Sequence, residues 1–409
     1  RRALGYDPIS PGPGFPAIVP PSIPEFLRML AVDPSNRKRI SIVRARVFLL
    51  RAALAPFPAA RLAFQEWRKA GPTSLRDVSP SERSLLPLLS PRITGLTESR
   101  EERDAANEAF REAWARNLSL VSAAGPAVAA LGDAGIPVLL LKGAALAFGD
   151  YASPGLRPMN DVDLLVPAAA AAGARRALES AGFRPSERHV EGFLESIHGL
   201  AFRGPDGLEV DLHWHTLLER PSRAADDLMF EEAVPLRVPG ISALAPSPEA
   251  HLLLVAVHAQ RWSAVPHFVG FADAFVLLGR CRPGRLVSMV AAARELGLLT
   301  PLARTLSVVE SALPGTLPAA LSAAIEREDP PLVDRLESFL RRRPHGLLSG
   351  LTLHWLAHRG AAPESTAGER LISFPARMRY VWGLGSRGSL AGEALRRASS
   401  RIRPGPGAA

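Results

Sequence analysis

Two residue types that often build or stabilise sites are nearly missing from this chain of 409 residues. Cysteine occurs once, at Cys281, which excludes an internal disulfide and any zinc site built on paired cysteines. Lysine occurs at three positions only, Lys38, Lys69 and Lys142, so the net charge of +9 comes almost entirely from arginine. An arginine-rich surface suits anionic partners such as nucleotides or nucleic acid. A bias toward Arg, Ala, Pro and Gly along the whole chain explains the charge about as well.

Long apolar runs are missing as well. The longest charge-free, apolar-leaning run, residues 117–132, contains Asn, Ser and Pro and is shorter than the ~20 residues that a membrane helix needs. No charged-then-apolar signal pattern follows Arg1. We therefore expect a cytoplasmic protein without a membrane partner. An apolar content of 47% and a charged content of 22% are typical of a folded chain, and this length favours more than one domain.

The pattern of the chain changes twice along its length. Residues 1–23 are rich in Pro and Gly and are expected to be disordered. Residues 24–111 carry helical patterns and form an expected N-terminal helical region. An α/β core is expected over 112–245, a C-terminal helical domain over 246–395, and a flexible tail over 396–409.

The central segment carries the strand signals. The continuous apolar run "IPVLLL" at 136–141 predicts a buried strand, and "NDVDLLV" at 160–166 predicts a second one. Between Pro167 and Gly182 the pattern is that of a helix. "HGLAFR" and "LEVDLHW", which flank the turn "GPDG", predict a hairpin. We therefore expect an α+β fold with a small mixed β-sheet flanked by helical regions.

Acidic side chains recur on one face of two predicted strands. Since side chains alternate along a strand, Asp161 and Asp163 point the same way. On the hairpin strand, Glu209, Asp211 and His213 share a face. Carboxylates that converge in this way raise each other's pKa unless a cation joins them, and their oxygens are the ligands that Mg²⁺ prefers.

The segment before these strands predicts a phosphate site. Lys142 and Gly143 lie where the apolar run passes into a helical pattern, "KGAALAF". A glycine lets the backbone approach a ligand closely, and a helix N-terminus presents free N–H groups to a phosphate. Carboxylates for a metal and a turn for a phosphate are the equipment for transferring a phosphate-linked group.

The order of these motifs resembles a known superfamily. Strand, "KG", helix, "RPMNDVDLLV", helix and "VDLHW" follow one another as in the nucleotidyltransferases that include DNA polymerase β. More narrowly, the chain resembles bacterial uncharacterised nucleotidyltransferases with a KG…R…D-x-D core. The resemblance covers roughly residues 80–280, including "GIPVLLLKGAAL" and the later "HLLLVAVHAQ" and "FADAFVLL".

The resemblance implies an enzyme with a metal centre. Asp161 and Asp163 match the paired metal ligands, and Asp211 matches the third carboxylate; all three are expected to be catalytic. The implied reaction transfers a nucleoside monophosphate from a nucleoside triphosphate to a hydroxyl or phosphate acceptor and releases pyrophosphate. The implied cofactor is Mg²⁺, with two ions expected.

The resemblance also implies a nucleotide-binding turn. Gly143 matches the glycine that touches the phosphates. Ala144 stands where the superfamily usually has a serine, and Lys142 is characteristic of the narrower family. Arg157 is a candidate for a further phosphate contact. We expect ATP as the nucleotide and a small molecule, protein or peptide as the acceptor.

Other polar residues have competing interpretations. His213 and His215 could bind zinc with His189 or His198, but histidines without a fixed ligand spacing are more often structural. His213 shares a face with Asp211, so a role beside the metal is open. His258 and Asp273 match recurrent positions of the narrower family, which favours helix packing or a substrate pocket.

Two other function classes compete with the enzyme. A non-catalytic or antitoxin-like nucleotide-binding module would share the fold, and the missing serine at Ala144 slightly favours it. A polymerase acting on nucleic acid would explain the charge of +9, but only 6% of the residues are aromatic and no recognisable nucleic-acid-binding module is evident. Nucleic acid is therefore not expected as a partner.

Overall fold

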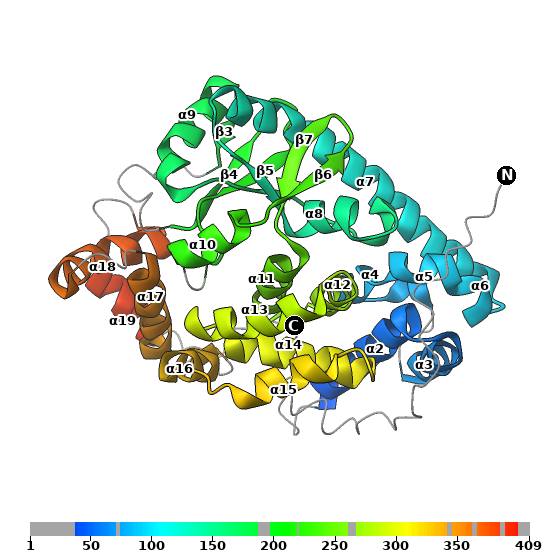
Figure 1. The fold of residues 1–409 in the computed structure, drawn as a ribbon. Helices are drawn as coiled ribbons and strands as arrows, with labels where there is room; N and C mark the ends of the chain where they lie inside the picture. Colours follow the sequence, from blue (N-terminus) through cyan, green and yellow to red (C-terminus); the bar gives the residue numbers. More distant parts are fainter. Residues whose placement is uncertain are drawn as a thin grey trace.

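The computed structural model describes residues 37–70, 74–186, 197–218, 221–260, 267–341, 346–361, 366–384 and 389–399. Within these residues the protein is a mixed α+β structure in which a seven-stranded sheet lies between N-terminal and C-terminal helical regions (Figure 1). The expected fold class is confirmed. The segment expected to be disordered, residues 1–23, and most of the expected tail lie outside the described residues.

The N-terminal region is helical. Its elements are α2 (Arg37–Leu54), α3 (Phe57–Ala70), η1 (Leu75–Asp77), α4 (Pro80–Arg83), α5 (Leu86–Leu89), η2 (Ser90–Arg92), α6 (Ile93–Leu96) and α7 (Arg100–Asp133). The Ser99 hydroxyl caps α7 by accepting the N–H of Glu102. Gly135, with φ of +68°, ends it, since a left-handed residue there favours glycine. As one continuous helix, α7 spans the expected boundary at residues 111 and 112 and lies along the sheet.

The sheet has the strand order β3-β4-β5-β2-β1-β7-β6. Its strands are β1 (Leu139–Leu141), β2 (Val162–Leu165), β3 (Arg184–Pro185), β4 (Gly199–Arg203), β5 (Glu209–His213), β6 (Val234–Val238) and β7 (Ile241–Ala245). β2 is antiparallel to β1 and parallel to β5, and β1 is parallel to β7. The helices between the strands are α8 (Lys142–Gly149), η3 (Pro154–Leu156), η4 (Ala168–Ala170), α9 (Ala171–Ser180) and α10 (Arg223–Phe230).

The strands predicted from the apolar runs and the hairpin are confirmed as β1, β2, β4 and β5, and the predicted helix as η4 and α9. Three strands were not predicted. β3 is only two residues long. β6 and β7 form a hairpin whose turn carries Gly240 at φ of +73°. The Pro-Gly pair at 239–240, between two stretches of alternating polarity, is the signal that predicts this hairpin.

Strand alternation divides the interior into two cores. Leu140, Val162 and Leu212 face the core that includes α7 and α9. Leu139 and Leu165 face the other core, which includes the C-terminal helices. Because Asp163 lies two residues from Leu165, it points to the second face. The predicted carboxylates therefore lie on the sheet face that turns toward the helical regions.

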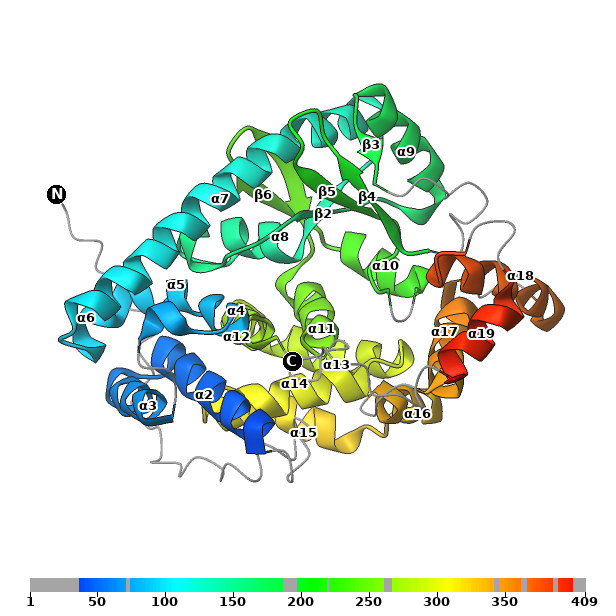
Figure 2. The same ribbon diagram turned by 180° about the vertical axis from the view of Figure 1, so that it is seen from behind.

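The C-terminal region is helical, as expected. Its helices are α11 (Pro248–Ala259), α12 (Phe268–Leu278), α13 (Pro283–Glu295), α14 (Leu299–Ala312), α15 (Ala319–Arg327), α16 (Leu332–Arg341), α17 (Leu347–Ala361), α18 (Ala367–Val381) and α19 (Leu390–Ser399). α11 to α15 share one core with α2, α3 and the sheet. In both ribbon views, α16 to α19 lie at the opposite end of the molecule from α2 and α3 (Figures 1 and 2).

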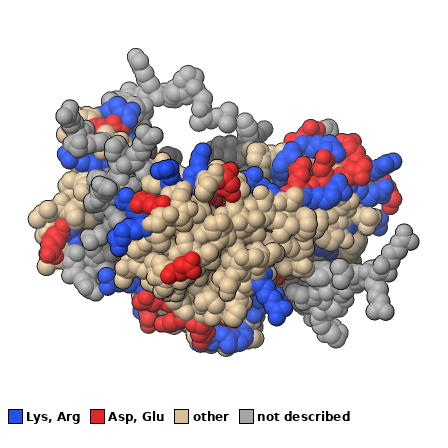
Figure 3. All heavy atoms as spheres, turned by 90° about the horizontal axis from the view of Figure 1, so that it is seen from above, with Lys and Arg blue, Asp and Glu red and all other residues tan. Residues whose placement is uncertain are grey.

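On the face of the molecule seen from above, charges are mixed in sign (Figure 3). Lys and Arg atoms there alternate with Asp and Glu atoms. The net charge of +9 is therefore not gathered into one patch on the described part of this face. Among the described helices, none has the length and apolar character needed to cross a membrane.

Candidate active site

Two of the predicted carboxylates lie side by side. Asp163 on β2 and Asp211 on β5 occupy directly paired positions of the two parallel strands. Asp163 is buried, with 5% of its surface exposed, and Asp211 is half-buried. Asp161 lies one residue before β2 and is exposed. The parallel register is what converges carboxylates that are 48 residues apart in the sequence.

A histidine joins these carboxylates. Asp163, Asp211 and His213 each offer a ligand atom, and these atoms all lie within 4.8 Å of one another. The Nε2 of His213 lies 2.8 Å from Oδ1 of Asp163. Within the described part of the chain, this is the one such group that could hold a metal ion. It contains two of the three predicted ligands, and His213 takes part instead of Asp161.

The Lys142 ammonium neutralises part of this charge. Its Nζ donates to Oδ1 of Asp163, the same oxygen that faces His213. Burial opposes ionisation of Asp163, yet Lys142 and His213 together hold the pKa of that carboxyl well below its usual range. Asp163 is therefore a carboxylate that is always ionised at neutral pH.

The pKa values of the other two carboxyl groups, those of Asp211 and Asp161, are raised instead of lowered. Burial, together with the charges of Asp163 and Asp161, raises the pKa of Asp211 to about 6. Although Asp161 is exposed as a residue, partial desolvation of its carboxyl group and the charge of Asp163 also raise the pKa of that group. Three negative charges in one place with a single ammonium among them leave the site short of positive charge, which is the electrostatic condition for binding a divalent cation.

Helix α8 begins directly at the site. Lys142 is its first residue and has a left-handed φ of +46°. The preceding residue, Leu141, provides no side-chain cap to the free N–H groups of this helix. The N–H of Lys142 donates to Nε2 of His251, on α11, at 3.1 Å. Burial and Arg157 lower the pKa of His251 to about 3, so the imidazole is a neutral acceptor.

Gly143 has a packing role that the sequence did not reveal. A Cβ at this position would lie 2.8 Å from the Cβ of Met159, closer than side chains tolerate. The glycine therefore lets the start of α8 pack against the loop before β2. Ala144, at the position of the superfamily's serine, is buried in the core beside α7.

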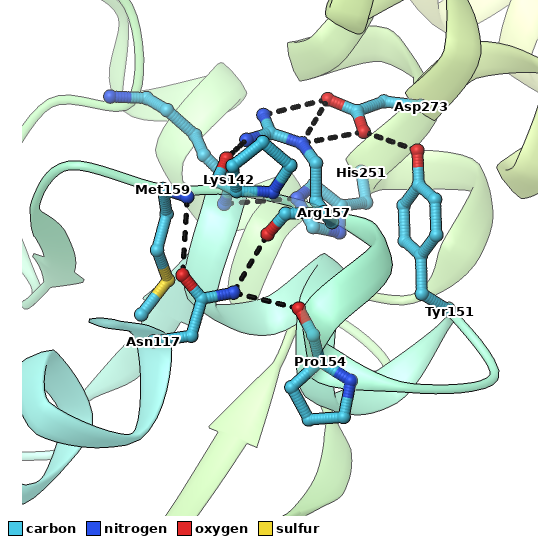
Figure 4. Close-up of polar contacts among 9 residues, drawn as sticks. Asn117, Lys142, Tyr151, Pro154, Arg157, Met159, His251 and Asp273 are labelled. Carbon is cyan, nitrogen blue, oxygen red and sulfur yellow. Dashed lines mark hydrogen bonds and ion pairs between the residues drawn. The ribbon is translucent and has the colours of Figure 1, made fainter. Parts of the chain in front are cut away.

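Arg157 is engaged with the C-terminal region. Its Nε donates to Oδ1 of Asp273 at 2.8 Å and its Nη2 to Oδ2 at 2.8 Å, a two-pronged pair with α12. The Tyr151 hydroxyl donates to the same carboxylate at 2.8 Å. Nη1 donates to the carbonyl of Pro158. Figure 4 shows Tyr151 and Arg157 meeting Asp273, with the Lys142 side chain extending away from this pair.

A buried asparagine holds the loop that carries Arg157. Asn117, on α7, donates through Nδ2 to the carbonyls of Pro154 and Arg157, both at 2.8 Å. Its Oδ1 accepts the N–H of Met159 at 3.2 Å (Figure 4). Both hydrogens of the amide and its oxygen are used, so the loop has one defined position relative to α7.

The remaining histidines lie in other surroundings. His215 contacts Asp226 of α10, with Nδ1 and Oδ2 at 2.7 Å, which is a structural contact. The His198 ring lies 5.2 Å from that of His213, but His198 is not part of the potential metal group. His189 lies outside the described residues. His258 is in the last turn of α11 and half-buried.

Three residues that hold the site together were missed by the sequence reasoning. His251 sits in an otherwise apolar helix, "HLLLVAVHA", and a polar residue there is a signal of a buried partner. Tyr151 is one of only three tyrosines in the chain, and Asn117 is a buried amide inside a long helix. The partners of all three are distant in the sequence, so no local pattern names them.

The protein thus places clustered carboxylates and the N-terminus of α8 on one face of a mixed sheet. A family model described as an uncharacterised nucleotidyltransferase matches residues 81–314. The match covers more than half of the chain, and the chain belongs to this uncharacterised nucleotidyltransferase family. The resemblance inferred from the motifs is confirmed at this level. No curated protein and no solved structure matches the chain.

Proposed function

We propose that this protein is a Mg²⁺-dependent nucleotidyltransferase. It transfers a nucleoside monophosphate from a nucleoside triphosphate to a hydroxyl or phosphate acceptor and releases pyrophosphate. The observation that carries the proposal is the paired position of Asp163 and Asp211 on β2 and β5, directly beside the start of α8. The same strand and helix order supports a place in the superfamily of DNA polymerase β.

The residues of the site fit a divalent ion. Asp163 and Asp211 offer oxygen ligands and His213 a nitrogen, at mutual distances within 4.8 Å. Asp161, exposed beside them, would complete the predicted carboxylate set. A bound Mg²⁺ supplies positive charge to the triphosphate and to the acceptor oxygen, and two ions are the expected number.

The start of α8 is suited to the phosphates. The N–H groups of the first helical residues have no intrahelical partner, and no side chain caps them. Lys142 brings a positive charge to the same place. Arg157 contributes indirectly in this proposal, because Asp273 and Pro158 occupy most of its donors.

With a hydroxyl acceptor, the reaction requires one proton to leave the acceptor. The acceptor oxygen forms a bond to the α-phosphorus, the bond from that phosphorus to the bridging oxygen of pyrophosphate breaks, and the hydroxyl proton is released. Asp211, the carboxylate on β5 that faces Asp163, is the residue proposed to accept that proton. Asp163 stays ionised and serves as a ligand only.

The test is transfer of label. Each α-labelled nucleoside triphosphate is incubated with the protein, Mg²⁺ and a cell extract, with the Asp161→Asn variant as the matched control. Label that moves to a small molecule, peptide or protein only with the unsubstituted chain supports the proposal; ATP is the first nucleotide to try. Equal labelling by both proteins would contradict it.

A second function is favoured by one observation. Lys142 pairs with Asp163, so its ammonium competes with a metal ion for that carboxylate. A non-catalytic nucleotide-binding or antitoxin-like module would keep this arrangement. Mg²⁺ titration separates the two functions: ion-dependent nucleotide binding supports the enzyme, and binding that is independent of the ion supports the module.

A further inference from the structure

The nucleotide-binding turn has a conformation that needs external support. Lys142 has a φ of +46°, which L-residues with a Cβ adopt at a cost of about 1–2 kcal/mol. It is also the first residue of α8, so its N–H has no partner within the helix. A strained residue with a free donor persists only if the surrounding structure holds it in place.

That support comes from the C-terminal region. His251, on α11 and 1% exposed, accepts the N–H of Lys142 through Nε2 at 3.1 Å. Since Nε2 is the acceptor, the proton of the neutral ring lies on Nδ1. The contact bridges 109 residues of sequence and joins α11 to the junction of β1 and α8.

A second contact fixes the other side of the same turn. Gly143 packs against Met159, and the Nη1 of Arg157 would lie 3.7 Å from a Cβ at Gly143. Arg157 is in turn held by Asp273 of α12. Helices α11 and α12 therefore hold the turn directly and through the loop before β2 (Figure 4).

We propose that His251 is a positioning residue that sets the Lys142 turn for the phosphates of the nucleotide. By holding the strained backbone of Lys142, it directs Nζ toward the carboxylate cluster and leaves the N–H groups of Gly143 and Ala144 facing a ligand. The inference rests on the proposed nucleotide function and adds a residue of the C-terminal helices to the nucleotide site.

The hydrogen bond itself can be observed without any activity. Because the chain has three lysines, a protein labelled with ¹⁵N-lysine gives three backbone amide signals, and Lys142→Arg identifies that of Lys142. With ¹⁵N-histidine added, an N–H···N bond gives a scalar coupling between the Lys142 amide and the His251 ring. We expect this coupling in the unsubstituted protein and its loss in His251→Met. Absence of the coupling in the unsubstituted protein would overturn the inference.

Binding then tests the role. His251→Gln places an oxygen where Nε2 lies and keeps an acceptor, whereas His251→Met fills similar space without one. With Mg²⁺ present, we expect His251→Met to weaken ATP binding about tenfold and to leave adenosine binding unchanged, as one lost hydrogen bond would do. His251→Gln is expected to stay within about threefold of the unsubstituted protein for both ligands.

One control variant and the comparison of ATP with adenosine separate the possible failures. His358→Met removes a buried histidine of α17 that contacts Ser373, so it lowers the melting temperature without changing the ratio of ATP to adenosine affinity. If the unsubstituted protein binds ATP no better than adenosine, the proposed function fails. If it prefers ATP and folded His251→Met keeps the same preference, His251 is not a positioning residue.

Discussion

Asp161 and Asp163 are two residues apart, yet the structure gives them different surroundings. Asp163 is buried and holds both Lys142 and His213, whereas Asp161 is exposed and carries no ion pair among the described contacts. A buried carboxylate that is paired with the half-buried Lys142 and the buried His213 has a structural role of its own. The exposed carboxylate contributes chiefly through its charge.

The Asp161→Asn and Asp163→Asn variants should therefore differ in stability. Asp161→Asn is expected to abolish nucleotidyl transfer and to leave the melting temperature within about 1 °C, since surface changes cost little. Asp163→Asn is expected to abolish transfer and also to lower stability by about 1–3 kcal/mol, because Lys142 loses its charged partner. Urea denaturation of both variants measures the difference. Equal stability would show that the Lys142–Asp163 pair contributes nothing to folding.

Asp211 makes the stability of the metal-free protein depend on pH. Its pKa in the folded state, about 6, lies above the ordinary value of 3.8, so the folded state holds the proton more tightly. Stability from this group is therefore present at low pH and falls as pH rises from about 4 to 6. Asp211→Asn should be more stable than the unsubstituted protein at pH 8 and equally stable at pH 4. Thermal melts without divalent ions at the two pH values check this, and a variant that is destabilised at pH 8 would contradict it.

At the scale of residues, alternation along the strands allowed part of the site to be predicted. It placed Asp211 and His213 on one face of their strand because their spacing is local, and the parallel pairing of β2 with β5 brings Asp163 beside them. The same reasoning could not find the partner of Arg157, since Asp273 lies 116 residues away and no pattern links them. Arg157 was predicted as a phosphate contact, which stays a prediction; the contact found in the structure is with Asp273.

At the scale of elements, the junction of β1 and α8 is held by contacts with two distant segments: α11, through His251, and the loop before β2, through Met159. Its glycine was predicted for close approach to a ligand, but Met159 already fills the space beside Gly143. The ligand-binding role and the packing role of Gly143 can be tested separately, because packing affects the stability of the protein without a ligand. If Gly143 is needed for packing, a smaller residue in place of Met159 should make room for a Cβ at position 143.

Gly143→Ala is expected to destabilise the protein by about 1–3 kcal/mol, the usual cost of overpacking. The double variant Gly143→Ala with Met159→Ala should recover stability relative to the expected sum of the two single changes, since the added methyl then occupies vacated space. Denaturation curves of the four proteins measure the coupling. Additive losses would mean that the two side chains do not compete for the same space.

The elements that the sequence reasoning missed have a common physical cause. β6 is an edge strand and β7 lies beside it; both have alternating exposure, and their pattern is weaker than that of the fully buried β1. By contrast, α7 repeats its helical period over many turns and has a Ser99 cap and a Gly135 stop, which are local signals. Short or half-exposed elements depend on their neighbours, which a local pattern does not contain.

At the scale of the whole molecule, a single apolar core contains residues from the N-terminal helices, the sheet and the C-terminal helices, which the sequence pattern had divided into separate regions. Residues from Val43 on α2 to Ala324 on α15 belong to the same apolar cluster, together with Leu139 and Leu165 of the sheet. In the described chain, neither of the two cores includes a residue beyond Ile325. We therefore expect the helices up to α15 to fold together with the sheet, and α16 to α19 to be less necessary.

Two fragments test this expectation. Residues 95–245 alone lack α11 and α12, expose one face of the sheet, and should bind ATP at least tenfold more weakly than the full chain or fail to fold. Residues 1–330 keep both cores and should bind ATP within about twofold of the full chain. Their melting temperature should fall slightly, because Asp334 no longer accepts the N–H of Thr300. A folded 95–245 fragment with full ATP affinity would place the nucleotide site within the sheet unit alone.

The long sequence separation between Arg157 and Asp273 also has a consequence for synthesis. A ribosome that adds ~5–20 residues per second makes the carboxylate roughly 6 to 23 s after the guanidinium, because 116 residues lie between them. Between the synthesis of His213, which completes β5, and that of Pro248, where α11 begins, the nascent chain has β1, β2 and β5 but not the C-terminal helices that share their core. The sheet face with Leu139 and Leu165 is then open to solvent, and a chaperone that binds exposed apolar strands would meet the growing chain at this stage.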